Sequence, residues 1–276
     1  MFASELGLGW VFDQAFYRIM QTTFYKYQGT GNDFVMIDDR SESFDVQDLA
    51  LVTKLCDRKF GVGADGLILI RNHPDFDFEM IYFNADGSQS MCGNGARCAV
   101  AFSGFLGIIQ VKTSFLAVDG PHEAILKDGI VELLMINVPG IEAKGDDCFV
   151  NTGTQHHVRL VEDIQNYPVF SEGKKMRYHE MYAPGGTNVN FMEPISEDEI
   201  FVRTYERGVE DETLSCGTGV TAAAIVFAQD KTDAEVKIKT LGGNLSVRFH
   251  KNEDGSMDNV WLIGPATQVF KGEIEI

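Results

Sequence analysis

The distribution of apolar residues along the chain predicts a protein built mainly of short strands. Runs rich in β-branched and aromatic residues, each bounded by Gly, Asn or Asp, are typical of strands. The Asp128-Gly129 pair predicts a tight hairpin turn between two of them. The expected strands span residues 34–37, 66–70, 78–83, 129–134, 158–161, 200–205, 236–239 and 245–249.

Few segments have the spacing of apolar residues that is typical of helices. Residues 46–55 show it, whereas residues 96–105 and 220–227 are apolar on nearly every side. A helix that is apolar all round is buried on all sides. Each of the two apolar segments follows a glycine-rich turn, so the pattern predicts a sheet wrapped around a central helix, present twice.

A short internal repeat supports this duplication. The segment CGNGA at 92–96 aligns with CGTGV at 216–220, and a strand with a charged turn precedes each. The segment GNDF at 31–34 is loosely echoed by GTNVNF at 186–191. We therefore predict an α/β (α+β) fold with two pseudo-symmetric domains, each a mostly antiparallel sheet around a central helix.

Composition narrows the classes of function. The chain has 276 residues and a formal net charge of −18, so the basic surface needed to bind nucleic acid is not expected. No apolar run approaches the roughly 20 residues that span a bilayer. The five cysteines are odd in number and form no CxxC pair, which favours reduced thiols in the cytoplasm and no metal site.

The first 22 residues differ from the rest. They carry apolar and acidic residues without the basic start of a signal peptide. We expect residues 1–22 to be an extension ahead of the first strand, with Met20 as a candidate start of the native protein. The domains are then expected at residues 23–137 plus 264–276, and at 138–263.

The repeated Cys-Gly turns point to proton chemistry. A cysteine just before a helix faces unpaired backbone N–H groups and the positive end of the helix dipole, which lower the pKa of a thiol toward neutrality. A single such cysteine is more often a buried structural thiol. Two in equivalent positions, Cys92 and Cys216, predict opposed bases on the two faces of one substrate carbon, one removing a proton and the other returning it.

This chemistry requires no cofactor and no metal. Unpaired backbone N–H groups at the starts of both helices would stabilise the charge that develops on the substrate carboxylate. The segment GVGADG at 61–66 is similar to a dinucleotide-binding motif, but it precedes a strand instead of opening a helix.

With these motifs the chain resembles the diaminopimelate epimerase family. The doubled cysteine motif is shared with proline racemases, whereas the NADG and YERG segments are specific to the epimerases. The matching segments are GTGNDFVMID (29–38), GVGADG (61–66), FNADGSQSMCGNGARC (83–98), NTGTQHHV (151–158), GTNVNF (186–191), YERGVEDETLSCGTG (205–219), LGGNLSVRF (241–249) and IGPATQVFKG (263–272).

The resemblance implies interconversion of LL- and meso-2,6-diaminoheptanedioate in lysine and peptidoglycan precursor biosynthesis. It implies a site in the cleft between the domains and a C-terminal strand that returns to the first domain. It implies catalytic roles for Cys92 and Cys216, and adjustment of the thiol pKa values by His156 and Glu206. The substrate-binding residues that it implies are Asn32, Asn84, Gly93, Asn94, Thr154, Asn188, Glu206, Arg207, Gly217 and Thr218.

The substrate's distal end is itself an amino acid, which suits the adjacent Glu206 and Arg207: a carboxylate for its ammonium and a planar cation for its carboxylate. Two departures from the family pattern affect substrate contacts. Thr154 stands in the usual Gly-Asn-Pro-His motif in place of Asn, and Gly66 stands where some members have Gln. His157 is a rival to His156.

Two alternatives stay open: a proline or hydroxyproline racemase of the same superfamily, and a thiol redox or binding protein. The expected partner is the small-molecule substrate, with neither nucleic acid nor membrane, and a homodimer is left open.

Overall fold

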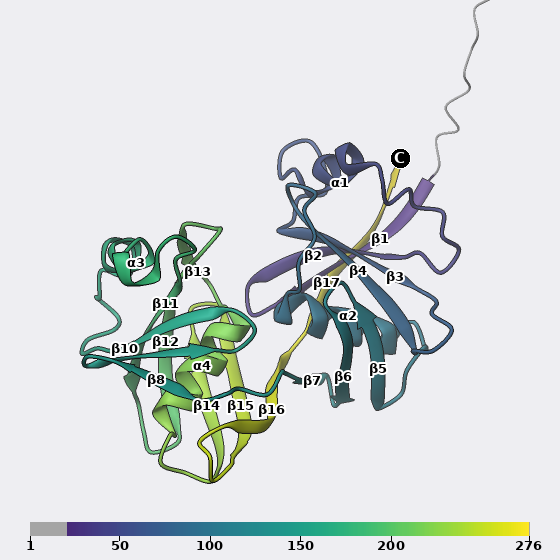
Figure 1. The fold of residues 1–276 in the computed structure, drawn as a ribbon. Coiled ribbons are helices and arrows are strands. Elements are labelled where there is room, and N and C mark those ends of the chain that lie inside the picture. The colour runs from purple at the N-terminus through teal and green to yellow at the C-terminus, as the bar shows by residue number, and fades with distance from the viewer. Residues whose placement is uncertain (1–20, 276) are drawn as a thin grey trace, which may run out of the picture.

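The computed structural model of the protein describes residues 21–275, which form two lobes lying side by side (Figure 1). Most of the predicted N-terminal extension therefore lies outside the described residues. Its last two residues, Gln21 and Thr22, already belong to the first strand. Among the described residues, no helix is long and apolar enough to cross a membrane.

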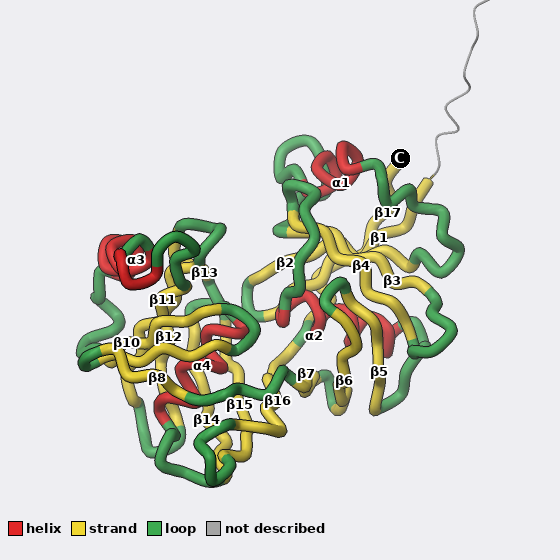
Figure 2. The backbone as a smooth tube through the Cα atoms, in the orientation of Figure 1, coloured by secondary structure: helices red, strands yellow, loops and turns green. Residues whose placement is uncertain are grey.

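The first lobe is a sheet that curves around the buried helix α2, drawn in red inside the strands in Figure 2. Phe34, Phe78, Phe102 and Phe115 are fully buried in its core, and the rings of Phe78 and Phe115 stack at 4.9 Å. The elements are β1 (Gln21–Gly29), β2 (Asn32–Asp38), α1 (Leu49–Cys56), β3 (Gly66–Arg71), β4 (Phe78–Asn84), α2 (Gly93–Phe105), β5 (Lys112–Ala117), β6 (Gly120–Lys127) and β7 (Ile130–Leu134).

The second lobe repeats this plan around helix α4, whose small and β-branched residues are buried on every side. Its elements are β8 (Ile141–Lys144), β9 (Asp147–Asn151), β10 (Gln155–Leu160), α3 (Val169–Arg177), the 3-10 turn η1 (Glu180–Tyr182), β11 (Asn188–Pro194), β12 (Glu199–Glu206), β13 (Asp211–Thr213), α4 (Gly217–Phe227), β14 (Asp233–Thr240), β15 (Gly243–Lys251) and β16 (Met257–Pro265); the C-terminal strand is β17 (Thr267–Glu275).

Strand pairing confirms the predicted fold class and the duplication. In the first lobe β2 and β3 are parallel, β4 runs antiparallel to β3, and β5 is parallel to β4 after helix α2. In the second lobe β10, β11, β12, α4 and β14 repeat these relations in the same order. The expected echo between residues 31–34 and 186–191 is wrong by one strand, because β2 corresponds to β10 and β11 corresponds to β3.

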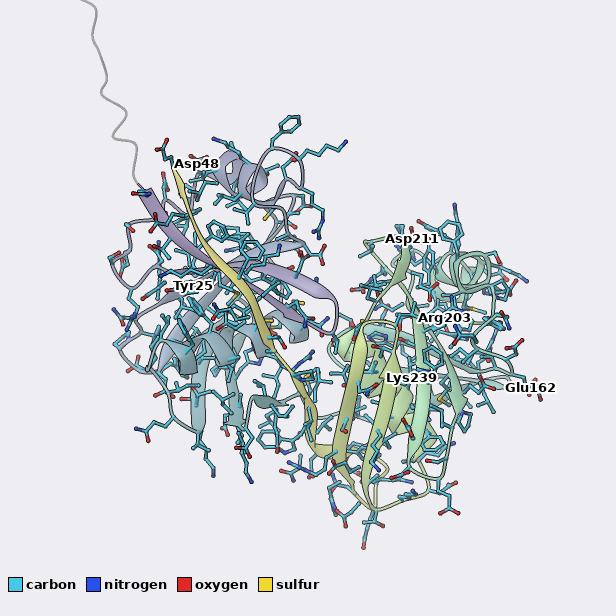
Figure 3. All side chains as sticks on the ribbon, turned by 180° about the vertical axis from the view of Figure 1, so that it is seen from behind. Tyr25, Asp48, Glu162, Arg203, Asp211 and Lys239 are labelled. Atoms are coloured by element: carbon cyan, nitrogen blue, oxygen red, sulfur yellow. The ribbon has the colours of Figure 1, made fainter. Side chains whose placement is uncertain are left out.

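Two strands join the lobes. One edge of β16 pairs with β15 in the second lobe, and Trp261 to Pro265 pair with β7 in the first. Strand β17 then pairs antiparallel with β1 along almost its whole length. Figure 3 shows β17 from behind, running along the first lobe beside Tyr25 of β1. The domain boundaries inferred from the sequence stay a prediction, since β16 has partners on both sides.

The local predictions are largely confirmed. Asp128 and Gly129 have φ of 52° and 78° and form the hairpin turn between β6 and β7. Helix α1 begins at Leu49 instead of residue 46, because the Asp48 side chain accepts from the N–H of Leu51 and caps it. Helix α2 is less apolar than expected, since it buries Arg97 completely.

Candidate functional site

The two repeated cysteines lie at the starts of the two central helices. Cys92 is the N-cap of α2 and Cys216 is the N-cap of α4, both with extended backbone. The glycine after each cysteine brings the helix starts together: a Cβ built on Gly217 would lie 3.7 Å from the Cα of Gly93. The two helix starts, each with a cysteine as its N-cap residue, therefore meet from opposite lobes.

Hydrogen bonds tie Cys92 to its own lobe, and its neighbour Asn94 reaches across to the other lobe. The Cys92 thiol donates to Asn32 Oδ1 at 3.4 Å, and the Gly95 N–H donates to the sulfur at 3.5 Å. The Asn94 amide Nδ2 donates to the carbonyl of Ser215, next to Cys216, at 3.2 Å. Asn32 and Asn94 thus lie at the junction of the two helix starts.

Cys216 contacts a different set of polar groups. Its sulfur lies 3.5 Å from Thr218 Oγ1, which accepts a hydrogen bond of 3.1 Å from the Thr154 hydroxyl. His156 Nε2 lies 2.8 Å from that Thr154 hydroxyl. His157, the rival histidine, instead contacts Tyr182 Oη through its Nδ1 at 2.8 Å, so only His156 faces the site.

The predicted lowering of the thiol pKa values is wrong for this structure. Burial raises the pKa of Cys92 and of Cys216, and the charge of Glu206 raises both further. Donors at the helix starts, the N–H groups of Gly95 and Gly219 among them, act in the opposite direction but are outweighed. The sequence indicates the helix start but not the loss of water around the sulfurs, and desolvation disfavours a charged thiolate.

Glu206 lies at the end of β12. Burial raises the pKa of its carboxyl group. The Thr213 hydroxyl donates a hydrogen bond of 2.9 Å to this carboxyl group. A half-buried carboxylate with so little compensation is suited to receive a cationic group.

Arg207 and Asn188 lie beside one another. The backbone N–H of Arg207 donates to Asn188 Oδ1 at 2.9 Å, and the side-chain amide of Asn188 donates to the backbone carbonyl of Gln155 at 2.9 Å. The Arg207 guanidinium reaches the carbonyl of Gly186 at 3.4 Å. None of these partners is a carboxylate, so the guanidinium charge stays available.

Asn84 is held within its own loop. Its amide donates to the hydroxyls of Ser88 and Ser90 at 3.0 and 3.2 Å. Its Oδ1 accepts a 2.7 Å hydrogen bond from the Tyr82 hydroxyl. Burial raises the pKa of Tyr82, and the negative charge of a Cys92 thiolate raises it further, so Tyr82 lies close to Cys92. Sequence analysis missed Tyr82 because strand β4 reads as ordinary core.

The structure shows what surrounds Gly66 and Thr154, the two positions that depart from the expected motifs. A Cβ on Gly66 would lie 2.5 Å from the Tyr82 ring and from the carbonyl of Phe83. Glycine at position 66 therefore leaves the space that the Tyr82 ring occupies. Thr154, the other departure, bonds to Thr218 as described above.

Arg97 is a second residue that sequence analysis missed. It is fully buried, and its guanidinium donates to Asn94 Oδ1 at 3.0 Å and to Thr30 Oγ1 at 3.2 Å. No ion pair among residues 21–275 includes it. A charged residue in a helix that is mostly small and apolar was the signal that could have found it.

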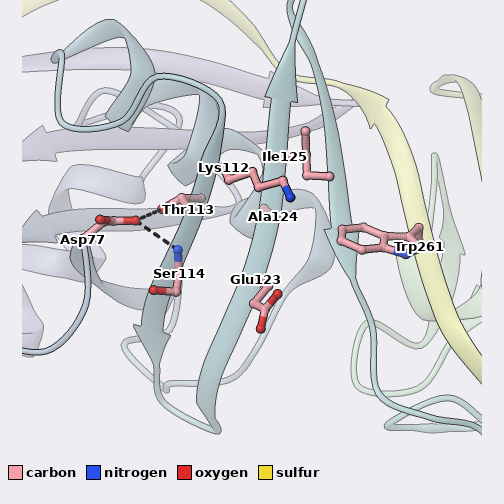
Figure 4. Close-up of a pocket in the computed structure, with 8 residues that line it drawn as sticks. All are labelled: Asp77, Lys112, Thr113, Ser114, Glu123, Ala124, Ile125 and Trp261. Carbon is pink, nitrogen blue, oxygen red and sulfur yellow. Dashed lines mark hydrogen bonds between the residues drawn. The ribbon is translucent and has the colours of Figure 1, made fainter.

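A separate cavity of about 410 Å³ lies elsewhere, beside β5 and β6 (Figure 4). It includes neither cysteine, and Asp77 closes one end by accepting hydrogen bonds from Thr113 and Ser114. Within residues 21–275, no three His, Cys, Asp or Glu side chains are grouped to hold a metal ion.

The comparisons with known sequences agree with one another. A family model described as diaminopimelate epimerase matches residues 24–124 and 148–269. A diaminopimelate epimerase of Flavobacterium psychrophilum is 50% identical over 254 residues, covering 91% of this chain and 99% of the relative. One from Aquifex aeolicus is 42% identical over 274 residues, covering 91% and 97%.

Solved structures share the fold at low sequence identity. A phenazine biosynthesis protein of the PhzF family from Bacillus anthracis has a TM-score of 0.76 at 12% identity, covering 94% of this chain and 100% of that one. A hydroxyproline epimerase from Agrobacterium vitis, with bound trans-4-hydroxy-L-proline, has a TM-score of 0.67 at 13% identity, covering 93% of each chain.

Proposed function

Because this chain belongs to the diaminopimelate epimerase family, we propose that Cys92 and Cys216 carry out its epimerase reaction, the interconversion of LL- and meso-2,6-diaminoheptanedioate. This reaction serves lysine and peptidoglycan precursor biosynthesis. The observation that carries the proposal is the meeting of two helix starts from opposite lobes, each with a cysteine as its N-cap residue.

The reaction moves one proton off the substrate and another on. A thiolate on one face takes the α-hydrogen as a proton, and the electron pair of the broken bond passes onto the substrate carboxylate. The pair then returns to the α-carbon and forms a new bond to the proton that the thiol on the opposite face donates, which inverts the centre. The products are the epimer and a thiol pair with exchanged protonation.

Backbone donors at the helix starts support this chemistry. The N–H groups of Gly93-Asn94 and Gly217-Thr218 stabilise the growing charge on the carboxylate without a cofactor. The raised thiol pKa values also fit a working site, because the substrate's α-ammonium brings a positive charge beside the sulfurs and favours the thiolate.

The distal amino-acid end requires its own recognition. Glu206 receives the distal ammonium and Arg207 holds the distal carboxylate in a bidentate manner. Substrate binding is completed by Asn32, Asn84, Thr154 and Asn188. Glu206 and His156 also adjust the thiol pKa values.

Deuterium exchange tests the two-base assignment. Incubation with LL-diaminopimelate in D₂O is expected to give the meso product with deuterium at the inverted carbon. Cys92→Ala and Cys216→Ala are each expected to lower this rate by about 10²–10⁴-fold, whereas Cys148→Ala, a half-buried thiol outside the site, retains it. Full inversion by either single alanine variant would refute the assignment.

The second candidate is a proline-type racemase, favoured by the structural likeness to the hydroxyproline epimerase. Glu206 and Arg207 argue against it, since a monocarboxylic substrate has no distal end to bind. Turnover of proline without turnover of diaminopimelate would establish it. If the chain were instead a thiol redox or binding protein, no α-deuterium exchange would occur with any substrate.

The five cysteines are all free thiols, which supports action in the reducing cytoplasm.

A further inference from the structure

The two thiols face hydrogen-bonding groups of opposite kinds. The amide of Asn32 has a defined orientation, because its Nδ2 donates to Asp65 Oδ2 at 2.7 Å. The group that it presents to Cys92 is therefore the carbonyl oxygen, an acceptor, at 3.4 Å. An acceptor beside a sulfur stabilises the protonated thiol and not the thiolate.

The hydrogen-bond direction on the other side begins at Asn190, which is completely buried in β11. Its Oδ1 accepts from the Thr204 hydroxyl at 3.0 Å, and its Nδ2 donates to the backbone carbonyl of His157 at 3.1 Å. A backbone carbonyl only accepts, so the atom facing it is the amide nitrogen. That same nitrogen lies 3.0 Å from His156 Nδ1.

The state of the His156 ring follows. Burial, then the charge of Arg207, lowers the pKa of His156 to about 3, so the ring is neutral near pH 7. Its Nδ1 accepts from Asn190, and the one ring proton must therefore sit on Nε2. Nε2 donates to Thr154 Oγ1 at 2.8 Å.

Each later link is then directed toward the sulfur. With its oxygen engaged by His156, the Thr154 hydroxyl donates to Thr218 Oγ1 at 3.1 Å. The Thr218 hydroxyl proton is left for Cys216 Sγ, 3.5 Å away. The relay, defined as Asn190, His156, Thr154 and Thr218, ends in a donor to Cys216, which stabilises the thiolate.

We propose that Thr154 and Thr218 are positioning residues that direct this relay, and that Cys216 carries the negative charge before substrate binds while Cys92 keeps its proton. The catalytic meaning of this asymmetry rests on the proposed function.

Other groups near the thiols act on both of them. Glu206 disfavours both thiolates, and for Cys216 its charge outweighs the hydrogen bond of Thr218. The Cys92 thiolate disfavours that of Cys216, and backbone N–H groups favour both thiolates. Arg97 favours a Cys92 thiolate, but it is the weakest of the influences on Cys92, and its guanidinium is bonded to Asn94 and Thr30 instead of the sulfur. In direct contact, Cys216 faces the hydroxyl of Thr218 at the end of the relay, whereas Cys92 faces the carbonyl oxygen of Asn32.

Thiolate absorbance, titrated without substrate, tests the proposal. In Cys92→Ser protein the signal of Cys216 is followed, and in Cys216→Ser protein that of Cys92. We expect Cys216 to ionise at the lower pH. Adding Thr154→Val is expected to raise the apparent pKa of Cys216 by about 1, the loss of one hydrogen bond to a charged group, and to leave that of Cys92 unchanged. Thr154→Ser, which keeps the hydroxyl, is expected to retain the original value.

Equal shifts of both thiols, or none, in Thr154→Val would overturn the relay, and a lower pKa for Cys92 would overturn the resting assignment. Thr218→Val and Thr218→Ser provide a second matched pair if Thr154→Val does not fold. Because no substrate is used, these results stand apart from the deuterium assay. A protein that fails to epimerise diaminopimelate would still show or lack the asymmetry.

Discussion

At the scale of single residues, the site holds charged groups that are costly to bury. Within residues 21–275, the partners of Arg97 are neutral, and one side chain, Thr213, donates to Glu206. Such groups reduce the stability of the folded protein, and they persist where function needs a poised charge. The predicted site residues, such as Cys92 and Cys216, lie within recognisable sequence motifs. Tyr82 and Arg97 were missed because their burial in the site depends on tertiary packing.

Replacing Glu206 by glutamine should make the empty protein more stable at neutral pH. Burial raises the pKa of Glu206, so the folded state binds its proton more readily than the unfolded chain. The stability from this carboxyl group is present below the ordinary Glu pKa and is lost as pH rises through the raised value. At pH 8 we expect Glu206→Gln to raise the free energy of unfolding by about 1 kcal/mol.

Urea unfolding at pH 4.5 and pH 8 measures this difference, which should be clearly smaller at the lower pH, where much of the carboxyl group is protonated in both states. The matched control is Glu253→Gln, on an exposed carboxylate, which should change little at either pH. An equal gain at both pH values would contradict the burial argument.

At the scale of elements, glycine at the helix starts is dictated by close packing. A Cβ on Gly219 would lie 2.3 Å from Asn190 Oδ1, the buried amide that begins the relay. We expect Gly219→Ala to lower the free energy of unfolding by about 1–3 kcal/mol, as overpacking does. Gly185→Ala, where an added Cβ meets nothing within 4 Å, should be near neutral in the same urea titration. Equal costs for the two variants would refute this explanation.

Leu262 of β16 packs beneath both helix starts. It is fully buried, and its Cδ2 would lie 3.3 Å from a Cβ on Gly93 and 2.9 Å from one on Gly217. Leu262→Ala leaves a cavity there and is expected to cost about 2–5 kcal/mol. Thermal and urea unfolding measure this, with Leu160→Ala, at 61% exposure, as the control. A loss no larger than that of the control would show that the junction repacks.

The strongly patterned elements could be predicted from sequence, and the weakly patterned ones could not. Helices α2 and α4 follow from their glycine-rich starts and apolar bodies. Helix α3 was missed because Val169 to Arg177 is short, mostly polar and interrupted by Gly173. That glycine is needed for packing, since its Cβ would lie 2.3 Å from the Cβ of Tyr205, a contact that sequence spacing does not reveal.

At the scale of the whole molecule, the repeat predicted two similar halves but not how they join. We propose domains at 23–137 plus 264–276 and at 138–263, with Gln21 and Thr22 of β1 added to the first, on the basis of the repeat and of the separate apolar cores around α2 and α4. The join itself is a matter of long-range strand pairing. Trp261 lies opposite Arg248 of β15 and opposite Leu134 of β7, so one strand contributes to both sheets.

A shared strand couples the stability of the two lobes. Unfolding either lobe would free one edge of β16, leaving its backbone N–H and C=O groups without partners. Hydrogen bonds from Met135 N to the Val260 carbonyl and from Val138 N to the Met257 carbonyl add to this coupling. We therefore expect the lobes to unfold together, in a single transition.

Probes placed in different parts can test this cooperativity in urea. In a Trp10→Phe variant, Trp261 is the remaining tryptophan and reports on the join, while alkylation of the buried Cys98 reports on the first lobe. Far-ultraviolet circular dichroism follows both lobes. The midpoints of the three signals should coincide, because the free energy of opening one lobe includes the loss of β16 pairing to the other. Separate midpoints for Cys98 and circular dichroism would instead mean that β16 leaves one sheet intact when the other unfolds.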